Sequence, residues 1–217
     1  MRIGILGTGT LATALAGSWI RAGHEVTIGG RSPERAEVAA RASGARSRPL
    51  PEVGGEADAV LLGVHWEGIS DILTAAGAPD GSLAGKPLID PTNAVEHGVG
   101  VLRTEPGHAI AHHVADLAPG AHVVKALHMF PATQWTALQP PPVTVAMCGN
   151  DPRALAIVGS LVSDIGGSPA VLGGLDRARQ LEEAAGFVIA LAFAGVDPQS
   201  AIPAVPSSRA HRTPPRS

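Results

Sequence analysis

The chain has 217 residues, a formal net charge of −3, 45% hydrophobic residues and 3% aromatic residues. This length and composition are enough for one large domain with an aliphatic core, which suits a sheet buried on both faces. The near-neutral charge, without a basic run that contains interleaved aromatics, argues against a nucleic-acid partner.

Other features of the sequence concern its compartment. No apolar run reaches the roughly 20 residues needed to span a bilayer, so we expect no membrane segment. The first strand pattern starts at once in "MRIGILG", so we also expect no signal peptide. The single cysteine, Cys148, cannot form an internal disulfide, which favours a cytoplasmic protein.

Strand and helix patterns alternate along residues 1–149. The predicted strands are 2–7, 25–30, 57–64, 86–92, 122–128 and 143–149, and the predicted helices are 10–23, 32–43, 66–76 and 107–120. The helix that starts at Ser32 has this residue as N-cap and Pro33 in its first position. This order predicts an α/β fold with a doubly wound, mostly parallel sheet of the Rossmann type.

The pattern changes after Asn150. A helix over 151–166 with Asp151 as N-cap, a short strand over 168–173 and a longer helix over 176–195 predict a small C-terminal α/β lobe at residues 150–196. Residues 197–217 are rich in Pro, Ser and Arg, and we predict that they form a disordered tail.

A glycine-rich motif joins the first strand to the first helix. In "GILGTGTLA", Gly7, Gly9 and Ala12 have the G-x-G-x-x-A spacing of a dinucleotide-binding turn. Gly7 permits the tight turn, Gly9 lets the backbone approach a pyrophosphate, and Ala12 lets the helix pack closely on the sheet. The free N–H groups of the helix N-terminus would then bind the anion. A purely structural glycine turn is the alternative.

The residues after the second strand predict which dinucleotide binds. An NAD site usually has a carboxylate there, which accepts hydrogen bonds from the ribose 2′-OH and would repel a 2′-phosphate. This chain has Gly30 and Arg31 instead, and an arginine can pair bidentately with phosphate. Ser32 can donate a hydrogen bond, and Arg35 lies one helical turn further on. The pattern favours NADP over NAD, against the alternative of two solvated arginines.

Several motifs together resemble the NADPH-dependent coenzyme F-420 (deazaflavin) reductase family. They are "IGGRSPERAE", "HWEGI", "VVKALHMFPA", "VAMCGNDPRA" and "LDRARQLE", in the order in which the family has them, and the resemblance covers about residues 1–195. It implies a homodimeric oxidoreductase that exchanges a hydride between NADPH and a small-molecule deazaflavin. It also implies a cleft between a Rossmann domain and a small C-terminal domain.

The resemblance also implies roles for individual residues. Pyrophosphate binding falls to Thr8, Gly9, Thr10 and Leu11, and 2′-phosphate binding to Arg31, with Arg35 at the position of a family lysine. Val64 and His65 would line the cofactor cleft. His128 and Ala132 would lie near the nicotinamide.

Three features depart from the family's pattern. His65 replaces a proline, "DPTNAV" resembles a broader family of reductases, and the Pro-rich tail replaces a hydrophobic C-terminal segment that helps to form the deazaflavin pocket. The second substrate therefore stays open.

His128 is the candidate catalytic residue, because it ends a buried strand at the carboxyl edge where α/β sheets bind ligands. A packing histidine is the alternative. A deazaflavin would need no acid from the protein, whereas a carbonyl or imine substrate would use His128 or His65 as proton donor. A catalytically silent NADP-binding sensor is a third possibility. We expect no metal site, since the adjacent His112 and His113 have no third ligand at useful spacing.

Overall fold

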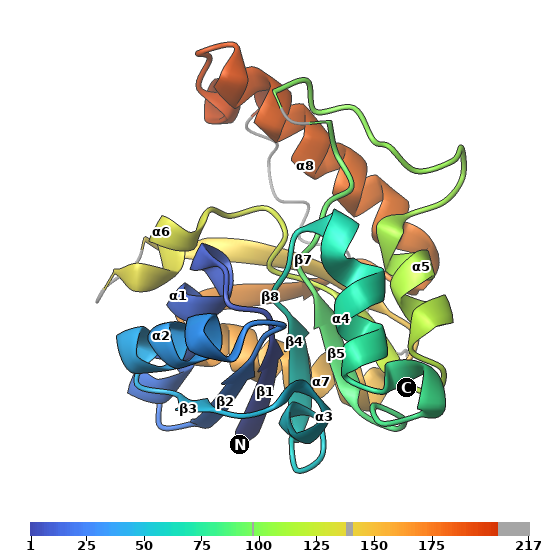
Figure 1. Ribbon diagram of the computed structural model, residues 1–217. Helices are drawn as coiled ribbons and strands as arrows, with labels where there is room; N and C mark the ends of the chain where they lie inside the picture. Colours follow the sequence, from blue (N-terminus) through green and yellow to red (C-terminus); the bar gives the residue numbers. More distant parts are fainter. Residues whose placement is uncertain (97, 138–140, 204–217) are drawn as a thin grey trace, which may run out of the picture.

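The structure is a computed structural model in which residues 1–96, 98–137 and 141–203 are described. Eight strands form one sheet in the order β3-β2-β1-β4-β5-β6-β7-β8, with eight α-helices around it (Figure 1). The strands are β1 (Arg2–Leu6), β2 (Glu25–Gly29), β3 (Arg46–Ser47), β4 (Ala59–Leu62), β5 (Pro87–Asp90), β6 (His122–Lys125), β7 (Val143–Gly149) and β8 (Gly167–Val171). The helices are α1 (Thr10–Arg21), α2 (Pro33–Ser43), α3 (Leu50–Val53), α4 (Ile69–Ala75), α5 (Ile110–Leu117), α6 (Ala132–Thr136), α7 (Pro152–Asp164) and α8 (Ala178–Phe193).

The sheet is mostly parallel, as the sequence predicts. The first six strands of the chain, β1 to β6, all run in one direction. Strand β7 is antiparallel to β6, and β8 is parallel to β7. The central strands are buried on both faces, because every residue of β4 and β5 is buried. This confirms the doubly wound α/β fold.

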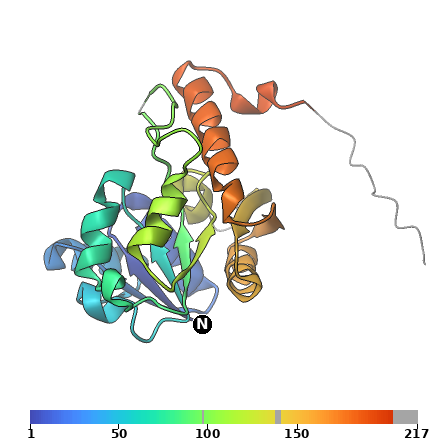
Figure 2. The same ribbon diagram turned by 90° about the vertical axis from the view of Figure 1, so that its right-hand side faces the viewer.

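Two apolar clusters cover the two faces of the sheet. On one face, α1, α2 and α7 bury side chains such as Leu15, Trp19 and Leu161. On the other face, α3, α4, α5 and the first turns of α8 bury side chains such as Ile72, Val114 and Leu181. Figure 2 shows that α8 continues beyond the sheet, on the side where the parallel strands end.

The predicted helix starts agree with the cap geometry. The hydroxyl oxygen of Ser32 accepts a hydrogen bond from Arg35 N at 3.2 Å, and Asp151 Oδ1 accepts one from Ala154 N at 2.6 Å. Each of these two helices has a proline in its first position. The short elements β3, α3 and α6 were not predicted, because two to five residues show no usable periodicity.

The boundary predicted at residue 150 does not separate two lobes. Strand β8 pairs with β7 along five residue positions, and α7 buries Val158 and Leu161 in the same cluster as α1. Strand β8 therefore extends the main sheet through its pairing with β7, and α7 packs on the face that α1 covers, whereas the second half of α8 stands away from the sheet. Residues 198–201 of the predicted tail form a short 3-10 helix, and residues 204–217 lie outside the described part of the chain.

In the described ranges, none of the helices combines the length and the apolar character that a membrane crossing requires.

Candidate cofactor-binding site

The turn between β1 and α1 packs directly against the end of β4. Gly7 has a φ of +129°, and its N–H donates to the carbonyl of Gly29 at 2.7 Å. A Cβ atom on Gly7 would lie 2.0 Å from the carbonyl oxygen of Gly63. Both the backbone angle and the available space therefore require glycine at this position.

Gly9 caps the N-terminus of α1 and faces open space. Its φ is −75°, which any residue can adopt, and a Cβ atom there would meet only the Gly63 carbonyl oxygen, at 3.8 Å. No side chain caps this helix, and its first turn carries no acidic residue. The first N–H groups of a 12-residue helix are thus free to bind an anion.

Ala12 sets the distance between α1 and the sheet. It is fully buried, and a Cβ atom on Gly63 would lie 2.7 Å from the Cβ atom of Ala12. A larger residue at either position would push the helix away from β4. The geometry of Gly7, Gly9 and Ala12 thus matches the three roles that the motif predicts.

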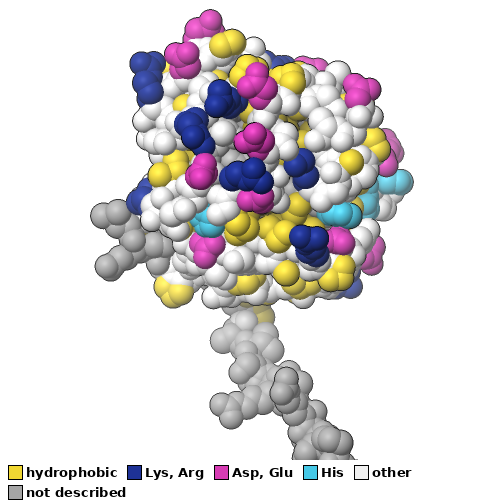
Figure 3. All heavy atoms as spheres, turned by 90° about the horizontal axis from the view of Figure 1, so that it is seen from below, with side chains coloured by type: hydrophobic (Ala, Val, Ile, Leu, Met, Phe, Trp, Pro, Cys, Tyr) yellow, Lys and Arg dark blue, Asp and Glu magenta, His cyan; other side chains and the backbone are white. Residues whose placement is uncertain are grey.

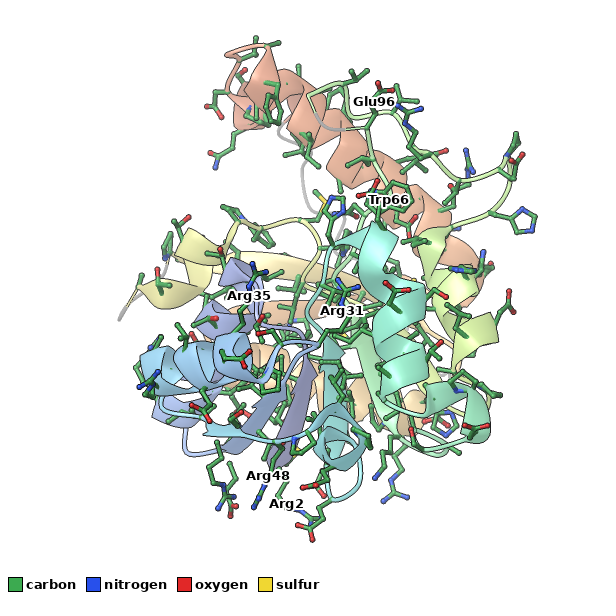
Figure 4. All side chains as sticks on the ribbon, viewed as in Figure 1. Arg2, Arg31, Arg35, Arg48, Trp66 and Glu96 are labelled. Atoms are coloured by element: carbon green, nitrogen blue, oxygen red, sulfur yellow. The ribbon has the colours of Figure 1, made fainter. Side chains whose placement is uncertain are left out.

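Arg31 spans the edge of the sheet from the end of β2 to the first turn of α4. Its Nη1 atom lies 2.6 Å from Asp71 Oδ2, and the two side chains are 60% and 65% exposed. A Cβ atom on Gly68 would lie 3.9 Å from Arg31 Nη2. Figure 4 shows Arg31 and Arg35 at the end of the sheet opposite Arg2 and Arg48. The adenosine half of a dinucleotide would bind at this edge.

The two polar neighbours of Arg31, Ser32 and Arg35, differ in whether they have a partner. The Ser32 hydroxyl donates to Glu34 Oε2 at 2.7 Å, so its proton is already engaged. This hydrogen bond lowers the pKa of Glu34, which keeps the carboxylate charged. The exposed guanidinium of Arg35 has no partner within the described residues. Arg35 is therefore freer than Ser32 to meet a 2′-phosphate.

Thr8 explains why residue 30 is a glycine. A Cβ atom on Gly30 would lie 2.7 Å from the Thr8 Cγ2 methyl group. The Thr8 side chain thus fills the space that a serine or threonine at position 30 would need. The two positions are coupled, and a larger residue at one of them requires a shift of the other.

Val64 and His65 follow β4, next to the phosphate turn. The Cγ1 atom of Val64 would lie 2.9 Å from a Cβ atom on Gly7, so Val64 packs against the turn itself. The His65 side chain is 69% exposed, with Nδ1 3.4 Å from Glu67 Oε2. Trp66 follows in the 3-10 helix Trp66–Gly68 that leads into α4. His65 is the more accessible of the two histidines predicted at this site.

His128 lies inside the protein, beneath the carboxyl edge of the sheet. Its residue exposure is 6%, and both ring nitrogens are buried without a hydrogen-bond partner among the described residues. Burial, and to a smaller extent the charge of Lys125, lower the pKa of His128 from 6.5 to about 3. The imidazole is therefore neutral near pH 7, and its nitrogens cannot touch a ligand in this conformation.

Ala132 is the first residue of α6, four residues after His128, and it is half-buried. The turn between them contains Phe130, whose ring meets Trp135 edge to face at 5.9 Å. This contact fixes the turn beside the core of the sheet.

A buried charged network adjoins His128 and was not predicted from the sequence. Lys125 Nζ lies 3.1 Å from Asp90 Oδ2 and 2.8 Å from Glu182 Oε1, and all three side chains are fully buried. "KPLID" and "HVVK" each show a polar residue at the end of an apolar pattern, and Glu182 lies in the mostly polar stretch "RQLEE". That signal does not reveal that the three side chains meet.

Two hollows lie at opposite ends of the strands. One, of about 430 Å³, borders the phosphate turn on the side of α1, α2 and α6, where Thr8, Thr10, Arg21, Ser43 and Thr136 line it. The other, of about 490 Å³, lies at the opposite end of the strands. Figure 3 shows that face with basic and acidic side chains interspersed. The ion pairs Arg2–Asp58 and Arg46–Glu25 account for part of this mixture.

The arrangement of the possible metal ligands and the state of the single cysteine bear on which chemistry the site can support. Within residues 1–96, 98–137 and 141–203, no group of three or more His, Cys, Asp and Glu side chains could hold a metal ion. Cys148 is buried, and burial raises the pKa of its thiol to about 11, so it is not a thiolate near pH 7.

Comparison with known proteins agrees with this fold. Residues 2–94 match the family model described as NADP oxidoreductase coenzyme F420-dependent. The chain is 30% identical to the metalloreductase STEAP3 of Rattus norvegicus over 185 residues, which is 83% of this chain and 36% of that protein. The chain thus spans about a third of the length of this curated relative.

Solved structures share the fold over most of this chain. A protein of Arthrobacter sp. FB24, provisionally assigned as an F420-dependent NADP reductase, is 26% identical with a TM-score of 0.75, covering 89% of this chain and 95% of that one. A reductive aminase of Aspergillus terreus, solved with NADPH and ethyl-5-oxohexanoate, is 21% identical with a TM-score of 0.67, covering 89% of this chain and 63% of that one. The second likeness concerns the fold alone. The family model thus matches the residues that contain the phosphate turn, and the fold is similar to that of these solved structures.

Proposed function

We propose that this protein transfers a hydride between NADP(H) and a deazaflavin coenzyme of the F-420 type. The observation that carries the proposal is the phosphate turn with an arginine, and no carboxylate, directly after β2, within residues that match an F420-dependent NADP oxidoreductase model. NADPH, when bound, supplies the hydride, and the deazaflavin takes up that hydride together with one proton.

Different residues of the chain would bind different parts of the cofactor. The N–H groups at the start of α1 would bind the pyrophosphate, and the open space at Gly9 would accommodate it. Arg31 and Arg35 lie where a 2′-phosphate would follow the ribose. Val64 and His65 would line the path towards the nicotinamide, and Ala132 would lie near its ring. Positioning of the two rings supplies most of the catalysis in such a transfer.

The state of His128 favours an acceptor that needs no acid from the protein. A general acid must reach the substrate and hold its proton near the working pH. His128 does neither in this structure, because its nitrogens are buried and its pKa is about 3. A deazaflavin can take its proton from solvent. A carbonyl or imine substrate would instead depend on His65, whose ring is accessible.

Absorbance of NADPH measured with and without added coenzyme F-420 tests the proposal. We expect rapid oxidation of NADPH only when the deazaflavin is present. A cyclic imine and a small ketone serve as competing acceptors. Oxidation by either of these, abolished by His65→Gln, would favour the carbonyl or imine reductase. Binding of NADPH without oxidation by any acceptor would favour the sensor.

We also propose that the protein is a homodimer that buries the far half of α8. Apolar side chains are exposed there and on the nearby loops, at Val99, Val101, Phe187, Val196 and Ile202. Light scattering after size-exclusion chromatography should give twice the chain mass, and Phe187→Glu should reduce it to one chain mass. A wild-type monomer at micromolar concentration would contradict this proposal.

A further inference from the structure

Three fully buried charged side chains meet where β5, β6 and α8 come together. Lys125 Nζ lies between Asp90 Oδ2, at 3.1 Å, and Glu182 Oε1, at 2.8 Å. Lys125 Nζ also donates to the backbone carbonyl of Thr92. Asp90 ends β5 and Lys125 ends β6, whereas Glu182 comes from α8, some 57 residues after the lysine in sequence.

The network leaves one negative charge in excess, and the backbone compensates for it. Ile110 N and Ala111 N donate to the two Glu182 oxygens at 2.9 Å and 3.2 Å. These N–H groups form the N-terminus of α5, whose dipole favours a carboxylate. The other Asp90 oxygen accepts from Thr92 N at 2.8 Å and from Thr92 Oγ1 at 2.6 Å. Every carboxylate oxygen of the network therefore has a partner, as burial of these charges requires.

The same network joins the loops that follow β5 and β6. Thr92 is held by Asp90 and Lys125, and the next residue, Asn93, donates from Nδ2 to the carbonyl oxygen of His128 at 2.8 Å. In the sheet, β2 and β1 lie on the adenosine side of the phosphate turn, and β4, β5 and β6 follow on the other side. The nicotinamide half of a dinucleotide extends towards these later strands.

We propose that Glu182 is a positioning residue, through which α8 holds Lys125 and thereby sets the loops of Asn93 and His128 against the nicotinamide. The location of the nicotinamide rests on the proposed function, whereas the effect of Glu182 on the two loops does not. The apolar side chains Ala178 and Leu181 already attach α8 to the core. A buried carboxylate adds little to such attachment, because its desolvation offsets much of the Coulombic gain. Glu182 instead fixes the position of Lys125 Nζ relative to the N-terminus of α5.

Glu182→Gln is a sharp test, because an amide cannot replace this carboxylate. Glu182 accepts three hydrogen bonds, from Ile110 N, Ala111 N and Lys125 Nζ, and its side chain donates none. A glutamine would present an NH2 group to at least one of these donors, so the network must rearrange. Glu183→Gln is the matched control, since Glu183 is the adjacent residue and makes an exposed pair with Arg179 at 2.9 Å.

Amide hydrogen exchange of the protein without cofactor gives the first readout. We expect Glu182→Gln to accelerate exchange at Thr92 N, which is bonded to Asp90 Oδ1, and at Ala126 N, which is bonded to the Asp90 carbonyl, by at least tenfold. Exchange in β1 and β2 should stay as in the wild type, and Glu183→Gln should change neither region. Unchanged exchange at Thr92 would overturn the proposal. Equal acceleration throughout the sheet would also overturn it, because that result would mean that Glu182 only attaches α8 to the core.

Kinetics give the second readout. With NADPH and a deazaflavin, Glu182→Gln should lower kcat at least tenfold while the Kd of NADPH, set mainly by the phosphate turn and Arg31, stays within threefold. An unchanged kcat would overturn the proposal. If Glu182→Gln does not fold, Glu182→Asp keeps the charge and shortens its reach, and it should show the same pattern. If the wild type oxidises no NADPH, the proposed function fails, whereas hydrogen exchange still tests the role of Glu182.

Discussion

Asp71 of α4 holds Arg31 through an ion pair of 2.6 Å, across the edge of the sheet where a 2′-phosphate would bind. The carboxylate and the phosphate therefore compete for one guanidinium. The pair is largely exposed, and such pairs contribute about 0.2–1 kcal/mol. We therefore expect Asp71 to weaken NADPH binding without abolishing it.

Removal of this competitor should strengthen NADPH binding. We expect Asp71→Asn to lower the Kd of NADPH by up to about fivefold, which corresponds to about 1 kcal/mol, and to leave the Kd of NADH unchanged. Asp58→Asn is the control, because Asp58 makes a similar exposed pair with Arg2 at the other end of the strands. Weaker NADPH binding by Asp71→Asn would show that the carboxylate orients Arg31 for the phosphate.

Gly7 and Gly9 should respond differently to substitution by alanine. In Gly7→Ala, an alanine would have to adopt a φ of +129°, and its Cβ atom would lie 2.0 Å from the carbonyl oxygen of Gly63. The protein should therefore lose about 1–3 kcal/mol or more of stability. Gly9→Ala meets nothing closer than 3.8 Å and should keep the melting temperature. Its added methyl group would occupy the path of the pyrophosphate, and the Kd of NADPH should rise at least tenfold. Unchanged NADPH affinity in Gly9→Ala would exclude the pyrophosphate from this turn.

The buried His128 should make stability depend on pH. Its pKa in the folded protein, about 3, is below the ordinary value of 6.5, so the unfolded chain binds the proton more strongly. The stabilisation is present above pH 6.5 and is lost as the pH falls towards 3. Between pH 7 and pH 5 the wild type should lose about 2 kcal/mol more than His128→Gln in urea unfolding. His113→Gln, on the exposed face of α5, should follow the wild type. Equal losses in wild type and His128→Gln would show that folding does not lower the pKa of His128.

The local signals of the sequence predict the sheet and the phosphate turn well. An apolar run followed by Gly-x-Gly has few alternatives, because only glycine tolerates the φ of Gly7 and its contact with Gly63. The N-caps at Ser32 and Asp151 are also local, since each side chain bonds to an amide three residues later. Such features depend on neighbours in the chain and can be read from it.

Contacts between distant residues could not be predicted. Nothing near Arg31 in sequence indicates its pairing with Asp71, and nothing near Lys125 indicates Glu182. The arrangement of the C-terminal residues could not be predicted either. The strand and helix patterns after residue 150 fit a separate lobe as well as an extension of the sheet. The pairing of β8 with β7 decides between these arrangements. The burial of His128 depends likewise on α8 and the surrounding loops.

Recognition of the 2′-phosphate by Arg31 is tested most directly by the ratio of the Kd values for NADH and NADPH. Titration calorimetry gives this ratio for the wild type and for Arg31→Gln. A charge-assisted hydrogen bond to phosphate contributes about 1.5–3 kcal/mol, so the wild type should prefer NADPH by at least about tenfold. Arg31→Gln should lose most of this preference by weakening NADPH binding alone. Arg48→Gln, an exposed arginine at the other end of the strands, should bind both cofactors as the wild type does. Equal affinities of the wild type for the two cofactors, or an equal loss of both in Arg31→Gln, would contradict recognition of the 2′-phosphate by Arg31.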